Sequence, residues 1–161
     1  MHDFTEQDHD HDSCIESALE RAEEICDEQG LRLTALRRQV LKLVWHSHKP
    51  IGAYDILEVL STDGRRAAPP TVYRALEFLI SAGLVHRLES LNAFIGCPDP
   101  SRSHSGQFLI CERCRAVVEL EDDDLSELLD NKAAKQGFAV THRMMEIQGI
   151  CQACRKTANV A

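Results

Sequence analysis

The amino-acid sequence predicts an α+β protein of two small domains, a helical domain that ends in a β-hairpin and a smaller α+β domain. Three observations predict this class. Apolar residues recur at helical spacing through most of residues 13–81, whereas residues 84–97 alternate apolar with polar side chains. Residues 98–105 contain proline and serine without periodicity, and two Cys-x-x-Cys pairs follow. We therefore expect a domain of residues 13–97, a second of residues 98–161, and an unfolded acidic, histidine-containing tail of residues 1–12.

Two long helices are expected first. The first begins near Ser13 and carries apolar residues at helical spacing until Gly30 stops the pattern. Thr34 is placed to cap a second helix through its hydroxyl group, and that helix ends near Pro50.

A shorter third helix is expected over residues 53–60, and a fourth over residues 71–81, after two prolines and before Gly83. The segments LVHRLES and NAFIGC then read as two strands that turn at residues 91–92.

The second domain combines strands with one helix. FLIC and AVVEL are strand-like and flank the first cysteine pair, and FAVTHRMMEIQGIC returns as a strand before the second pair. Between them, DDDLSELLDNKAAKQG predicts a helix whose acidic residues lie at the favourable N-terminal end.

Composition narrows the function classes. The chain of 161 residues has no apolar run long enough to span a membrane and no signal-peptide pattern at its start, so we expect a cytoplasmic protein. Seven cysteines in that compartment favour metal ligation over disulfides. The net charge is −8, but residues 1–29 carry eleven acidic and one basic side chain, whereas residues 30–97 carry nine basic and five acidic. The locally basic segment is compatible with binding to DNA phosphates.

The strongest chemical signal is a set of four cysteines in two pairs, each pair separated by two residues. Two such knuckles supply the four sulfur ligands of a closed tetrahedral zinc site, which indicates a structural role. Thirty-six residues separate the pairs, more than in most zinc ribbons, as expected if a helix and a strand lie between them. A redox switch and an iron–sulfur site are the alternatives, and the pattern favours them less. The four residues are Cys111, Cys114, Cys151 and Cys154.

The fourth helix is the candidate DNA-reading element. Arg65 and Arg66 precede it, and its first turns carry Thr71, Tyr73 and Arg74 opposite an apolar face. A helix-turn-helix presents such residues to base edges and phosphates. The pattern alone leaves open an ordinary amphipathic helix with a solvated basic end.

The string PPTVYRALEFLISAGLVHRLES closely resembles the recognition helix and wing of the ferric uptake regulator family. RLTALRRQVLKLV is similar to the second helix of that family, with Ala35 where proline is usual, and the cysteine pairs resemble its structural zinc site. The resemblance implies a winged helix-turn-helix DNA-binding domain joined to a small α+β dimerisation domain with structural zinc. It also implies a metal-loaded homodimer that binds palindromic double-stranded operators and blocks transcription.

A second, sensory metal site is expected around the hinge between the domains. His86, Cys97, His104 and Glu119 match the sensory ligands of the zinc uptake regulator (Zur) branch of this family, and a thiolate among imidazoles favours zinc over ferrous iron. SRSHSGQF stands where the iron-sensing branch carries a His-His-Asp-His run. The resemblance thus implies a repressor of zinc-uptake genes with two zinc ions per chain, one structural and one regulatory.

Other functions remain as alternatives. An iron or peroxide sensor of the same family is the nearest. A zinc hydrolase would use His86, His104 and Glu119 around a metal with an open water position, but no nucleophile or base signature accompanies them. A zinc-stapled interaction module would not explain the basic segment. We therefore expect a regulator and not an enzyme.

Overall fold

The computed structural model describes residues 11–47, 49–62, 68–100, 106–120 and 122–158. These residues fall into two compact units, an N-terminal unit (residues 11–100) and a C-terminal unit (residues 106–158). Most of the expected tail, residues 1–10, lies outside the described residues. No helix in the described ranges combines the length and apolar character that crossing a membrane requires.

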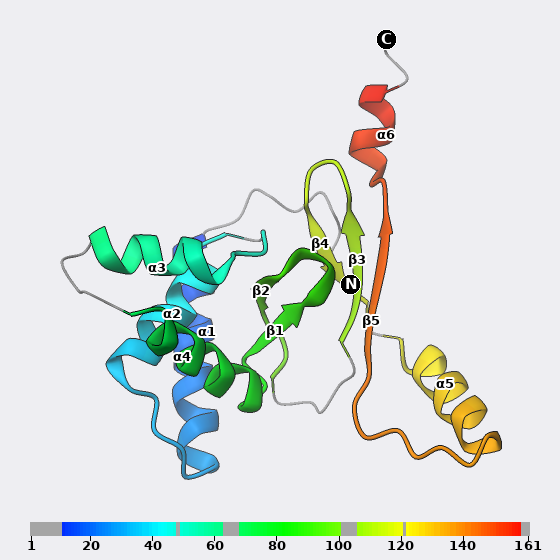
Figure 1. Ribbon diagram of the computed structural model, residues 1–161, viewed down its shortest axis with the longest axis horizontal. Coiled ribbons are helices and arrows are strands. Elements are labelled where there is room, and N and C mark those ends of the chain that lie inside the picture. The colour runs from blue at the N-terminus through cyan, green and yellow to red at the C-terminus, as the bar shows by residue number, and fades with distance from the viewer. Residues whose placement is uncertain (1–10, 48, 63–67, 101–105, 121, 159–161) are drawn as a thin grey trace. The chain divides into compact units, whose positions relative to one another are not determined.

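The N-terminal unit contains four helices and a two-stranded antiparallel hairpin, as the sequence predicts (Figure 1). A short 3-10 turn, η1, and the left-handed residue Asn92 (φ +45°) reverse the chain between the two strands. The elements are α1 (His11–Glu28), α2 (Ala35–Trp45), α3 (Ala53–Thr62), α4 (Pro69–Ser81), β1 (Val85–Leu88), η1 (Glu89–Leu91) and β2 (Ala93–Gly96).

The ends of these helices follow from local chemistry. Thr34 caps α2, because its extended backbone lets Oγ1 accept a hydrogen bond from the N–H of Arg37 at 3.4 Å. Gly83, with φ +74°, directly follows the C-cap residue of α4. The prediction that α4 begins after its two prolines is wrong by two residues. Pro69 and Pro70 are its first residues, because the first turn needs no N–H donors there.

The core of this unit lies between the helices and one face of the hairpin. Val85 and Phe94 of the hairpin join the buried apolar residues of α1 to α4. The indole of Trp45, at the end of α2, lies so close to Gly96 that a Cβ atom there would be only 2.8 Å from Cζ2. The hairpin is therefore fixed against α2 by a contact that requires glycine.

The C-terminal unit is a three-stranded sheet with two helices. The strand order is β4-β3-β5, with β3 antiparallel to β4 and parallel to β5, so β5 is an edge strand of this sheet. Its elements are β3 (Gly106–Cys111), β4 (Val117–Glu119), α5 (Asp123–Lys135), β5 (Met144–Gly149) and α6 (Gln152–Ala158).

Two features of this unit differ from the sequence prediction. The last strand begins at Met144 and not at Phe138, because the six described residues of β3 are already paired with Met144–Gly149. Before the strand, Arg143 donates hydrogen bonds to the carbonyl of Ser126 and to Asp130, which ties this segment to α5. The second difference is α6, which the sequence pattern did not predict.

Candidate metal centre and nucleic-acid interface

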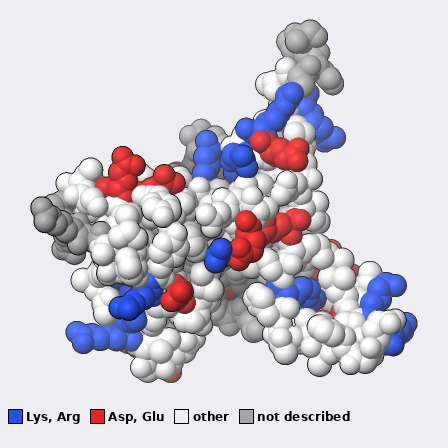
Figure 2. Space-filling view, viewed as in Figure 1, with Lys and Arg blue, Asp and Glu red and all other residues white. Residues whose placement is uncertain are grey.

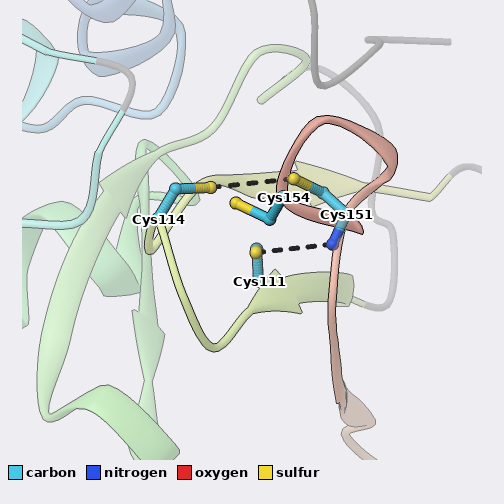
Figure 3. A group of neighbouring side chains, drawn as sticks. All are labelled: Cys111, Cys114, Cys151 and Cys154. Carbon is cyan, nitrogen blue, oxygen red and sulfur yellow. Dashed lines mark hydrogen bonds between the residues drawn. The ribbon is translucent and has the colours of Figure 1, made fainter. Parts of the chain in front are cut away.

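The four cysteines predicted to bind metal lie together in the C-terminal unit (Figure 3). All four Sγ atoms lie within 4.8 Å of one another, and they form the one group of three or more potential metal ligands found among the described residues. Cys111 and Cys151 are buried, and Cys114 and Cys154 are partly exposed. The sheet thus brings the two sequence-distant pairs to a single point.

Local backbone geometry builds each half of this cysteine quartet. Cys111 ends β3, and the chain reverses through Arg115, whose φ of +61° is left-handed and whose N–H donates to the Cys111 carbonyl. Cys151 follows β5, and the N–H of Arg155 donates to its carbonyl in the first turn of α6. Because β3 and β5 are parallel neighbours, both pairs lie at the same end of the sheet. The unpredicted helix α6 therefore carries the fourth cysteine, Cys154.

The sulfur geometry fits zinc. In a tetrahedral site with zinc–sulfur bonds of about 2.3 Å, neighbouring sulfurs lie about 3.8 Å apart. The Sγ atoms of Cys114 and Cys151 are 3.8 Å apart, and the other pairs fall within the same 4.8 Å limit. Four thiolates with no open position make a structural site.

Two thiols of the cysteine quartet have pKa values that are shifted in opposite directions. Burial acts to raise the pKa of the Cys111 thiol, but hydrogen bonds, chiefly from the N–H of Cys151 at 3.4 Å, lower it overall to about 6. Hydrogen bonding to the Cys151 sulfur raises the pKa of the Cys154 thiol to about 12. Without metal, the site therefore holds one thiolate beside a thiol that stays protonated at neutral pH until a metal ion displaces its proton.

Basic side chains accompany the quartet. Arg113, inside the first pair, donates a hydrogen bond to the Cys154 carbonyl at 3.0 Å and so joins the two knuckles. Arg115, Arg155 and Lys156 are exposed close to the cysteines in sequence. Figure 2 shows Lys and Arg side chains gathered around α6. Because four thiolates and one zinc ion carry two net negative charges, these cations offset the charge of a filled site.

Two of the four predicted sensory ligands share one face of the hairpin. His86 pairs with Ile95 in the β1–β2 ladder, and the N–H of Cys97 continues the ladder by donating to the Leu84 carbonyl at 3.0 Å. Side chains directly opposite each other, or two residues apart on one strand, point to the same side. His86 and Cys97 therefore lie diagonally on one face, opposite to the face that carries Val85.

Both of these groups are shielded. Cys97 is only 3% exposed, and the Nε2 atom of His86 is buried. An isolated histidine in a hairpin is usually a surface residue, and the burial of Nε2 argues against that interpretation of His86.

Glu119 and His104 complete the predicted sensory set. Glu119 ends β4 in the C-terminal unit, and both of its carboxylate oxygens are buried. A carboxylate that merely solvates a strand would keep its oxygens in water. His104 lies outside the described residues, so the structure places His86 and Cys97 on one face of the hairpin and leaves the predicted four-ligand site untested.

Sequence reasoning missed the support behind Glu119. Gln107 of β3 is 2% exposed, and its Nε2 atom donates to Ser126 Oγ at 2.9 Å and to the Asp122 carbonyl at 3.3 Å. The backbone carbonyl of Gln107 also accepts a hydrogen bond of 2.7 Å from the N–H of Leu120, the residue after Glu119. This glutamine joins the end of β4 to the first turn of α5. Its only sequence signal was a polar residue inside an apolar strand.

Helix α4 exposes the described residues that the sequence predicts to contact DNA. Val72 and Leu76 are buried against the core, whereas Thr71, Tyr73 and Arg74 are exposed, with Tyr73 39% exposed. Arg65 and Arg66 lie outside the described residues.

The start of α4 has few backbone donors. Pro69 and Pro70 have no N–H, and the N–H groups of Thr71 and Val72 donate to the Ala68 carbonyl at 2.9 and 3.4 Å. Any phosphate held at this end must therefore be bound mainly by side chains.

A helical unit with a hairpin and a sheet unit with a cysteine quartet invite comparison with known regulators. A model of the ferric uptake regulator family matches residues 28–148. The chain belongs to the ferric uptake regulator family. The fold that the sequence predicted, a winged helix followed by a small α+β domain, is thereby confirmed.

Among relatives within this family, the zinc uptake regulation protein of Escherichia coli (strain K12) is 41% identical over 137 residues, which cover 84% of this chain and 80% of that protein. A solved zinc uptake regulator complexed with zinc and DNA superposes with a TM-score of 0.86 at 38% identity, over 90% of this chain and 97% of that chain. Holo XcZur superposes with a TM-score of 0.81 at 45% identity, over 87% of this chain and 98% of that chain. The chain is thus similar along most of its length to zinc uptake regulators.

Proposed function

We propose that this protein is a zinc-responsive transcriptional repressor that binds palindromic operators of zinc-uptake genes as a metal-loaded homodimer. The observation that carries the proposal is the similarity, over 90% of the chain, to a zinc uptake regulator complexed with zinc and DNA. A repressor of this kind would work in the cytoplasm, as expected from the sequence. It would regulate without catalysing a reaction.

In this proposal, Thr71, Tyr73 and Arg74 meet the operator. They are exposed on the first turns of α4, and the opposite face of the helix is anchored in the core. Because the prolines remove backbone donors from this end, these three side chains, with Arg65 and Arg66 before the helix, would supply most contacts to phosphates and base edges.

Each chain would hold two zinc ions. The cysteine quartet would bind the first, and its closed four-sulfur shell suits a permanent structural ion. His86, Cys97, His104 and Glu119 would bind the second. The shared hairpin face of His86 and Cys97 and the buried carboxylate of Glu119 support this assignment.

The second ion would act as the switch. Two ligands belong to the predicted DNA-binding domain (13–97) and two to the predicted dimerisation domain (98–161), so zinc would favour one arrangement of the domains among many. The ratio of zinc affinities for that arrangement and for the others would then set the upper limit on how far zinc raises operator affinity.

The C-terminal unit offers a surface for the homodimer. Strand β5 is the edge of its sheet, and Ile147 on it is 44% exposed. Phe138, before the strand, is 66% exposed, and Leu128 on α5 is 51% exposed. An edge strand with exposed apolar side chains is a surface that a second copy can cover.

The test is operator binding at buffered free metal concentrations. A labelled palindromic duplex, selected from random sequence with the zinc-loaded protein, is titrated with protein while a chelator sets the free zinc concentration. We expect affinity to rise with zinc, and a Cys97→Ser variant to lose this response while remaining a folded dimer. If binding follows ferrous iron or peroxide treatment and ignores zinc, the alternative sensor within the family replaces the proposal.

Zinc content supplies a second readout. We expect two zinc ions per chain, one easily removed by chelator and one resistant. A content of one zinc ion per chain would contradict the proposal of a separate sensory ion.

A further inference from the structure

A second contact holds the chain at Cys97, and it comes from α1. Arg21 Nη1 donates a hydrogen bond of 2.6 Å to the carbonyl oxygen of Pro98, a residue 77 positions later in the sequence. This carbonyl belongs to the residue directly after Cys97. The side chain of Arg21 on α1 is therefore hydrogen-bonded to the backbone next to Cys97, a proposed sensory ligand.

Arg21 lines an open groove on the surface of the N-terminal unit. Four of its lining residues, Arg21, Glu24, Ile25 and Glu28, are spaced by three, four and seven positions and so form one stripe along α1. The chain after β2 supplies the opposite wall, and the groove has a volume of about 550 Å³. The other wall consists of Pro98 and Asp99.

Cys97 is consequently held on both sides. The N–H of Cys97 donates to the Leu84 carbonyl at 3.0 Å. The carbonyl of the following residue, Pro98, accepts a hydrogen bond from Arg21. Before it, Gly96 lies against the indole of Trp45. Of these three contacts, the hydrogen bond from Arg21 leads to α1, and the other two lead to Leu84, just before β1, and to Trp45 of α2.

We propose that Arg21 is a positioning residue for the sensory metal: its hydrogen bond to Pro98 fixes the backbone of Cys97 against α1. This inference rests on the proposed function, in which Cys97 binds the regulatory zinc. Holding Cys97 in place before metal arrives lowers the ordering cost of binding. The same bond couples metal capture to α1, which contributes Leu19, Ala22 and Ile25 to the core shared with the recognition helix.

The coupling can be measured first without the sensory metal. In protein from which a chelator has removed only the weakly held zinc, so that the quartet keeps its ion, alkylation of a buried thiol reports how often its surroundings open. Cys97 is 3% exposed and Cys26, in the core formed by α1, is 1% exposed, so Cys26 serves as an internal reference for unfolding of the whole unit. In Arg21→Ala we expect Cys97 to react about fivefold faster and Cys26 at an unchanged rate, consistent with loss of one exposed charge-assisted hydrogen bond.

The matched control is Arg38→Ala. Arg38 is also an arginine that holds α1, through a 2.8 Å ion pair with Glu23, but this contact leads to α2 and not to Cys97. Both variants lose one positive charge, so the change in net charge is the same in each. Alanine is a strong helix former, so the Arg21→Ala change does not weaken α1 itself. Arg21→Lys retains a cationic donor and should restore most of the wild-type alkylation rate.

The second measurement is the zinc response of operator binding. We expect Arg21→Ala to need about fivefold more free zinc for half-maximal binding, and Arg38→Ala to match wild type. If wild type itself ignores zinc, the proposed function fails. If wild type responds and Arg21→Ala responds identically, only the role of Arg21 fails. Equal acceleration of Cys97 and Cys26 alkylation would also overturn it, because Arg21 would then stabilise the whole unit.

Discussion

The contact between Gly96 and Trp45 allows a quantitative prediction for Gly96→Ala. An added Cβ would lie 2.8 Å from Trp45 Cζ2 and closer still to Cε2 and Nε1, inside the distance that real Cβ atoms keep. Gly96 lies outside the left-handed region, so the alanine backbone is unstrained and the cost is steric. The indole is rigid, so either the ring or the hairpin must move. Such overpacking costs about 1–3 kcal/mol, which lowers Tm by about 5–20 °C for a unit of this size.

The assay is thermal unfolding followed by the fluorescence of Trp45, the single tryptophan of the chain. The control is Gly149→Ala, followed by circular dichroism because it lies in the C-terminal unit; a Cβ there would meet nothing within 4 Å apart from its chain neighbours. A second change, Trp45→Leu, removes the ring and should recover part of the loss, as a double-mutant cycle by circular dichroism would measure. A Gly96→Ala protein with the Tm and fluorescence of wild type would refute the steric argument.

Other consequences follow from the C-terminal unit and from α4. Cys151→Ser should abolish tight zinc binding at the quartet and unfold the C-terminal unit while helices α1 to α4 persist, as zinc analysis and NMR would register; an intact sheet without zinc would contradict this. Zinc uptake by the metal-free quartet should release protons at pH 7, because the Cys154 thiol stays protonated until metal binds, both in the folded unit, where its pKa is raised to about 12, and in an unfolded chain, where a thiol has its ordinary pKa; an indicator dye measures the release, and none is expected if the thiols are already ionised. Arg74→Ala should lower the slope of log affinity against log salt by about one, and an unchanged slope would remove Arg74 from the phosphate contacts. Asp122→Ala should cost about 1 kcal/mol, because the 2.9 Å cap on the Leu125 N–H is lost, whereas a denaturant midpoint equal to that of wild type would show the cap to be dispensable.

Much of the fold could be predicted because its signals are local. The cap at Thr34, the glycine after α4 and the alternation in the hairpin each depend on a few neighbouring residues. The predicted start of α4 is two residues too late because the prolines that mark it are placed before the helix, although the first turn of a helix tolerates them.

The errors in the C-terminal unit have a different cause. Residues 138–143 include aromatic and β-branched side chains that are typical of strands, but a strand forms only where a partner strand is available, and β3 pairs from Met144 onward. The short helix α6 depends on the second cysteine knuckle and not on apolar periodicity. Both depend on tertiary pairing, which a local pattern does not encode.

The candidate sites divide in the same way. Four cysteines in two close pairs are legible in sequence, and the structure brings their sulfurs together. The contacts that position Cys97 are not legible, because Arg21 and Pro98 are 77 residues apart and Gly96 gives no hint of the ring against it. Residues that bind metal show a pattern of type and spacing, whereas residues that position them show neither.

The two proposed zinc sites differ in a way that suits their roles. The quartet takes all four ligands from one end of one sheet, so its ion closes a shell inside a single unit and its binding energy becomes folding energy. The hairpin supplies only His86 and Cys97, fewer donors than the four that zinc takes. An ion held there tightly must recruit ligands from beyond the hairpin, and its occupancy is therefore tied to where those ligands are. The hairpin site, which needs ligands from outside its own unit, can therefore couple zinc binding to a change in domain arrangement. The quartet, which is complete within one unit, holds its zinc as part of the fold.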